Sequence, residues 1–99
     1  MPDLIVDISE PAVTQMKHAL RANLPTVMNG HRIEALARGL GFNSYAALRH
    51  QGEKRGYALW DGKDARFSAF LAERAYSVPS DSLHPIIEPH IARRSPPAA

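Results

Sequence analysis

The stretch that decides the fold is Ile33-Glu34-Ala35-Leu36-Ala37-Arg38-Gly39-Leu40-Gly41-Phe42-Asn43-Ser44-Tyr45-Ala46-Ala47-Leu48. Its first half repeats apolar residues at the spacing of an amphipathic helix. Ala37, Gly41 and Ala47 then stand where a helix-turn-helix needs a small residue, a turn glycine and an apolar residue. Asn43 or Ser44 can cap the second helix. The stretch therefore predicts a tight helical hairpin.

Further helices are expected on both sides of this hairpin. Residues 10–23 follow Ser9 with an acid and a proline, which is typical of a helix start. Residues 63–75 carry a second amphipathic pattern, and Pro85 and Pro89 limit the next segment to a short helical turn. The predicted fold class is mainly α, with four to five short helices. They are expected to pack around Leu20, Ile33, Leu36, Leu40, Phe42, Leu48, Phe67, Phe70 and Leu71.

Two short segments have the character of strands. Residues 4–8 are largely β-branched, and residues 57–60 end at an Asp-Gly turn, so the two can pair as a minor β-ribbon. Pairing within one chain and pairing between two chains of a homodimer both stay open. Residues 51–56 are expected to form a polar loop. Trp60, next to the turn, is expected to be partly exposed and is the candidate anchor of a protein interface.

The chain has 99 residues and no cysteine. This length predicts one helical domain over residues 1–92, with a disordered tail over residues 93–99. Without cysteine, disulfides and thiolate zinc sites are excluded. The sequence shows neither a signal-peptide pattern nor an apolar run long enough to span a bilayer. We therefore expect a cytoplasmic protein that does not contact a membrane.

Positive charge gathers in the middle of the chain. Residues 17–56 hold seven lysines and arginines against two glutamates, although the net charge of the whole chain is only +2. Such an uneven distribution bears on the choice of partner. In a nucleic-acid reader, the second helix of the hairpin would enter the major groove. The residues that would then contact bases or phosphates are Arg38, Asn43, Ser44, Arg49, His50, Lys54 and Arg55.

The sequence offers little for catalysis or metal binding. A metal site needs three or four converging ligands, and His31 and Glu34 form the single pair that is close in sequence. Asp61 and Asp64 are explained as a turn residue and a first-turn helix acid. We therefore expect no enzyme, no catalytic residues, no metal site and no cofactor.

Residues 31–49 also resemble a known helical module. A helix that ends in Leu-Ala-x-x-Leu-Gly-Phe, followed by a Ser-Tyr-x-x-Leu helix, is similar to a module in small bacterial, plasmid and phage proteins. Those proteins are often labelled glyoxalase-related. The resemblance implies a mobile-element context but no glyoxalase activity, because such active sites place their metal ligands on several strands.

These patterns indicate two classes of function. The favoured one is a non-catalytic binding protein of mobile-element type that modulates a larger bacterial protein complex, such as a defence or conjugation system. The alternative is a nucleic-acid-binding or regulatory protein that uses the helix-turn-helix-like segment 33–50.

Overall fold

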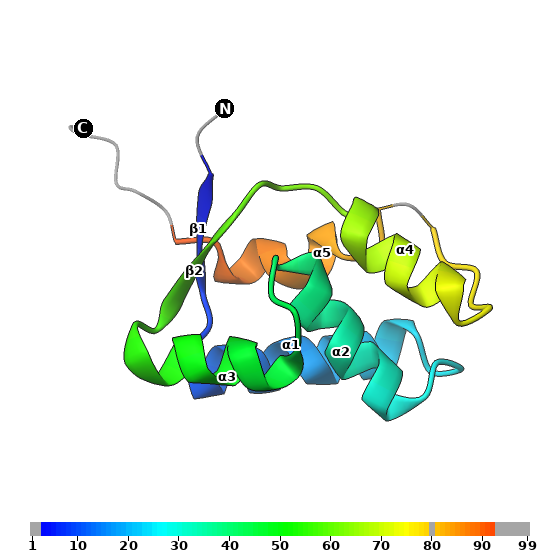
Figure 1. Cartoon of the computed structure of the whole chain (residues 1–99), viewed down its shortest axis with the longest axis horizontal. Coiled ribbons are helices and arrows are strands. Elements are labelled where there is room, and N and C mark those ends of the chain that lie inside the picture. Colours follow the sequence, from blue (N-terminus) through cyan, green and yellow to red (C-terminus); the bar gives the residue numbers. More distant parts are fainter. Residues whose placement is uncertain (1–2, 80, 93–99) are drawn as a thin grey trace.

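A computed structural model of the chain describes residues 3–79 and 81–92 (Figure 1). The predicted tail, residues 93–99, lies outside this part. The elements occur in the order β1 (Leu4–Asp7), α1 (Glu10–Asn23), α2 (Asn29–Gly39), α3 (Tyr45–Lys54), β2 (Tyr57–Trp60), α4 (Ala65–Glu73), α5 (His84–Ile87) and a 3₁₀ turn (Glu88–His90). The chain is therefore mainly helical with a small antiparallel sheet, as predicted. Across its described helices, none combines the length and apolar character needed to cross a bilayer.

The predicted hairpin is the pair α2 and α3. Ala37 is fully buried. Gly41 takes a φ of 96°, a backbone conformation that residues with a Cβ atom rarely adopt. The Ser44 hydroxyl accepts a hydrogen bond from the Ala47 N–H at 3.1 Å and so caps α3. The Glu34 carboxylate of α2 accepts a hydrogen bond from the N–H of Tyr45, the first residue of α3, at 3.1 Å. One side chain of α2 and one of the connection between the helices thus fix the start of α3.

The two predicted strands pair antiparallel within the chain. Leu4 lies opposite Trp60, and Asp7 lies opposite Tyr57. On the other side of β1, the Ala92 N–H donates to the Ile5 carbonyl at 2.7 Å, and Val6 forms a bridge with Ile91. Residues 91–92 therefore close the outer edge of β1.

Helix α2 lies in the middle of the molecule and contacts α1, α3 and α4 (Figure 1). Gly39 lets α2 pack closely against its neighbours, because a Cβ there would lie 2.5 Å from the Leu83 side chain and 3.0 Å from Phe67 of α4. Of the predicted core, Ile33 and Phe42 are only half-buried. The largest fully buried side chains are Trp60, Phe67, Ile8, Met16, Leu20, Leu36, Leu48, Leu71, Leu83, Ile87 and Val6.

Three sequence predictions are wrong in detail. Helix α3 continues to Lys54, so residues 51–54 of the predicted loop are helical and only residues 55–56 connect α3 to β2. Helix α4 is shorter than the predicted 63–75. Trp60 is 0% exposed and cannot serve as an exposed interface anchor. Strand β2 alternates between exposed and buried residues, and Trp60 shares the inward face with Ala58.

Candidate protein-binding surface

One edge of β2 faces away from its partner strand. The Ile8 N–H donates to the Gly56 carbonyl at 3.0 Å, immediately beyond the paired residues. Residues of an antiparallel pair alternate between bonding toward the partner and bonding away from it. The backbone groups of Ala58 therefore point toward β1, whereas those of Tyr57 and Leu59 point toward the opposite edge.

These outward backbone groups are largely unpaired. Over residues 3–79 and 81–92, the one hydrogen bond to them comes from Gln51, whose Nε2 lies 3.2 Å from the Tyr57 carbonyl oxygen. The Leu59 N–H and carbonyl have no protein partner in that part of the chain. An unpaired strand edge is a template for another extended segment.

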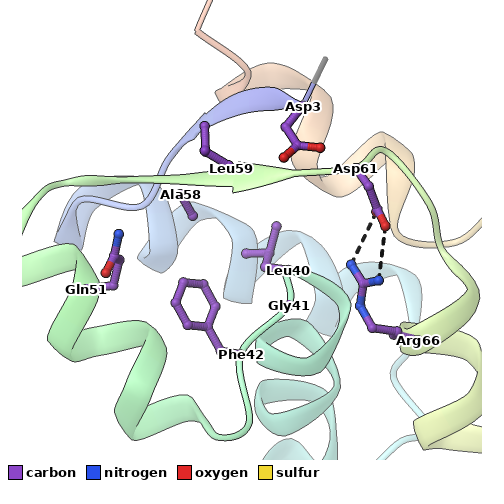
Figure 2. A pocket seen from close by; sticks show the side chains of 9 residues that line it. All are labelled: Asp3, Leu40, Gly41, Phe42, Gln51, Ala58, Leu59, Asp61 and Arg66. Carbon is purple, nitrogen blue, oxygen red and sulfur yellow. Dashed lines mark hydrogen bonds and ion pairs between the residues drawn. The ribbon is translucent and has the colours of Figure 1, made fainter. Parts of the chain in front are cut away.

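The outward face of the same strand is apolar. Leu59 is 57% exposed and Tyr57 is 40% exposed. Figure 2 shows Leu59 directed away from the helices, while Ala58 points toward them. A further large exposed hydrophobic side chain, Met28 at 65%, precedes α2 and is not on this strand. Strand β2 thus presents both unpaired backbone groups and apolar side chains to solvent.

An open hollow of about 590 Å³ lies along this edge (Figure 2). Leu40 and Phe42, from the turn between α2 and α3, lie opposite β2, and Gln51 lies toward one end. The Asp61–Arg66 pair lies at the other end. The complete lining is Asp3, Leu40, Gly41, Phe42, Gln51, Ala58, Leu59, Asp61 and Arg66.

The charged end of the hollow is held by Arg66. Its guanidinium donates to both carboxylate oxygens of Asp61, at 3.0 and 3.2 Å. It also donates to the Arg38 and Gly39 carbonyls at the end of α2, at 3.2 and 3.3 Å. The hydrogen bonds from Arg66 lower the pKa of Asp61, which is therefore ionised at neutral pH. The sequence suggested Asp61 as a turn residue but not this connection between α2 and α4.

Two of the predicted nucleic-acid-binding residues have structural roles. The Arg38 Nε donates to the Asn43 carbonyl at 3.0 Å, and its guanidinium lies 5.4 Å from the centre of the Phe70 ring. The Ser44 hydroxyl is the cap of α3. Both side chains therefore stabilise the hairpin, and Asn43 remains exposed beside them.

Arg49 contacts other side chains as well. It lies 3.6 Å from Glu53, and Lys17 of α1 donates to the Tyr45 hydroxyl at 3.1 Å. Partial burial acts to raise the pKa of Tyr45, but hydrogen bonds from Lys17 and Arg49 outweigh it, and the pKa is lowered. These contacts join α1 to α3. His50, Lys54 and Arg55 are exposed at the far end of α3.

The residues considered for metal binding or catalysis are also engaged. His31 Nδ1 lies 3.0 Å from the Tyr76 hydroxyl, and Glu34 accepts from α3. Asp64 accepts the N–H groups of Leu83 and His84 at 3.0 and 3.2 Å, at the start of α5. Within the described residues, no three histidine, cysteine or acidic side chains converge as metal ligands would.

Comparisons with protein-family models, with characterised proteins and with solved structures found no match to this chain. The geometry of the surface therefore carries the functional argument. The sequence did contain one signal for this surface: residues 57–60 have the character of a strand, in which Tyr57 and Leu59 share one face and Ala58 and Trp60 the other. Alternation indicates two faces but does not say which edge of the strand stays open.

Proposed function

We propose that this protein is a non-catalytic binding protein that attaches to a larger protein through the open edge of β2. The observation that carries the proposal is the unpaired backbone of Leu59 beside the exposed Tyr57 and Leu59 side chains. Backbone hydrogen bonds give such an edge affinity for an extended segment, and side chains give it specificity. In this proposal the bound protein belongs to a bacterial complex that the small domain modulates.

The mobile-element part of the proposal rests on the sequence. The resemblance of residues 31–49 to a module of plasmid and phage proteins supports it. In the fold, the turn of that module forms one wall of the hollow through Gly41 and Phe42. The same residues would therefore serve the hairpin and the binding surface.

Replacing Leu59 by lysine is expected to abolish partner binding without unfolding the protein. A charged side chain on an edge strand opposes the docking of another strand, and Leu59 is too exposed to matter for the core. Tagged wild-type protein and variant are compared in pull-downs from the native host, read by quantitative mass spectrometry. Recovery of the stoichiometric partner should fall roughly ten-fold or more, as for a central interface residue.

The matched control is Met28→Lys. Met28 is even more exposed than Leu59 but is not on β2, so the same charge change there should leave recovery unchanged. Thermal melts of both variants exclude a loss of fold. Equal recovery by wild type and Leu59→Lys would show that β2 is not the binding surface.

Nucleic-acid binding is the second candidate, because the end of α3 is exposed and basic. His50 and Lys54 are four residues apart and share one face of α3, and Arg55 is the next residue along the chain. Against this, Arg38 and Ser44 are already engaged within the hairpin. The exposed basic side chains of His50, Lys54 and Arg55 suit phosphates better than base edges.

The triple variant Arg49→Ala, Lys54→Ala, Arg55→Ala tests this candidate. If these side chains contact phosphates, duplex affinity should fall steeply with salt, because each contact releases counterions. The variant should then bind more weakly, and its salt slope should be flatter by roughly one unit per lost contact. Fluorescence anisotropy at low and moderate salt measures both. Absence of duplex binding by the wild type at low salt would rule this candidate out.

A further inference from the structure

We propose that the segment bound at β2 is an extended peptide of the partner, that it adds as a third strand, and that it places a basic side chain beside Asp3 and Asp61. This inference rests on the proposed function and specifies the chemistry of the partner. It depends on three features of the surface: the open edge, the hollow beside it, and the two carboxylates at one end.

The first feature restricts where a strand can be added. Residues 91–92 already bond to the outer edge of β1 through the Ile5 carbonyl. The outer edge of β2 carries free backbone groups at Leu59 and a hollow alongside. An added strand needs about 4.8 Å of lateral space, which a hollow can supply and a packed surface cannot. In the described part of the chain, β2 is thus the edge that can take a third strand.

The second feature determines which side chains the peptide needs. A peptide residue that bonds to Leu59 directs its own side chain to the outer face, next to Leu59 and Tyr57. Its two neighbours point the other way, into the hollow above Leu40 and Phe42. Apolar or β-branched residues of the peptide suit both of its faces. The peptide therefore does not need the alternation of polar and apolar residues that is typical of a surface strand.

The third feature determines the charge of the peptide. Asp3 precedes Leu4, which lies opposite Trp60, so Asp3 and Asp61 are at the same end of the ribbon. Both line the hollow. Arg66, the basic residue of the lining, is already shared between Asp61 and the carbonyls of α2. Asp3, Asp61 and Arg66 together keep one negative charge. A lysine or arginine of the peptide would complement it, and an acidic residue would be repelled.

Synthetic capped peptides of alternating threonine and valine test this chemistry. One peptide begins with lysine and another ends with it, so that antiparallel and parallel addition are both sampled. Matched peptides carry glutamate in place of lysine. Binding to the full chain is followed by isothermal titration and by hydrogen exchange of the Leu59 amide.

One lysine peptide is expected to bind roughly ten-fold more tightly than its glutamate counterpart, because attraction is replaced by repulsion. The Leu59 amide should exchange more slowly when that peptide is bound. Asp3→Lys should remove most of the preference for lysine. Glu88→Lys makes the same charge change at a carboxylate outside the lining and should leave the preference intact.

The outcomes separate this inference from the proposed function. If lysine and glutamate peptides bind equally, or if no peptide protects Leu59, the inference is wrong. The proposed function survives that result as long as Leu59→Lys still abolishes recovery of the partner protein. If the chain instead dimerises at higher concentration and Leu59→Lys prevents this, a second copy occupies the edge and the inference is also wrong.

Discussion

Gly52→Ala is expected to lower the free energy of unfolding by about 2 kcal/mol, the balance of an overpacking cost of about 3 and a helix-propensity gain of about 1. A Cβ at Gly52 would meet the Ile8 carbonyl oxygen far inside van der Waals contact. That oxygen belongs to the backbone just after β1, so it cannot rotate away as a side chain could. Relief requires α3 to move away from the ribbon. Urea denaturation followed by circular dichroism measures the change.

Gly30→Ala is the matched control. Gly30 lies in the first turn of α2, and a Cβ there has no neighbour within 4 Å. Alanine should therefore stabilise the protein by about 0.5 kcal/mol, because it restricts the unfolded chain and favours helix. Equal stability of the two variants would contradict the close packing of α3 against the Ile8 carbonyl.

Arg32→Met is expected to cost about 3 kcal/mol, because it leaves the buried Val27 carbonyl without a donor. Arg32 is only 7% exposed. Its guanidinium donates to the Leu24 carbonyl at 3.1 Å, to the Val27 carbonyl, and to Asn29 Oδ1 at 3.3 Å. The side chain thus fixes the connection between α1 and α2. Methionine keeps the unbranched apolar stem but supplies no N–H group.

Arg21→Met provides the comparison for Arg32. Arg21 is exposed on α1, and substitutions at such positions usually change stability by less than about 0.5 kcal/mol. Both variants lose one positive charge, so an effect of net charge alone would be equal in the two. Equal melting temperatures for the two variants would contradict the structural role of Arg32.

The sequence predicted those parts of the fold that depend on local chemistry. The turn at Gly41 and the cap at Ser44 depend on backbone conformation and on one short hydrogen bond. The β-branched residues of 4–8 and the Asp-Gly turn after residues 57–60 indicate the two strands. Gly52 is misleading in the sequence, because a glycine near polar residues indicates a loop, whereas here it permits close helix packing.

Long-range packing explains what could not be predicted. The pattern Tyr57-Ala58-Leu59-Trp60 shows which residues share a face of β2, but only the helices determine that Trp60 faces inward. Arg32 is one of the seven lysines and arginines of residues 17–56, and the sequence does not show its buried role, because its acceptors become close only when the connection between α1 and α2 folds. The open edge of β2 depends on the distant residues 91–92, which bond to the other strand.

Hydrogen exchange of the β2 amides in the free protein tests the central claim, that this edge is open. The Ala58 and Trp60 amides face β1 and should exchange slowly, because exchange requires the ribbon to open. The Leu59 amide faces solvent and should exchange near the rate of an unfolded peptide. Residue-resolved NMR distinguishes these neighbours directly. Protection of Leu59 equal to that of Ala58 would mean that the edge is already covered, and would contradict the proposed binding surface.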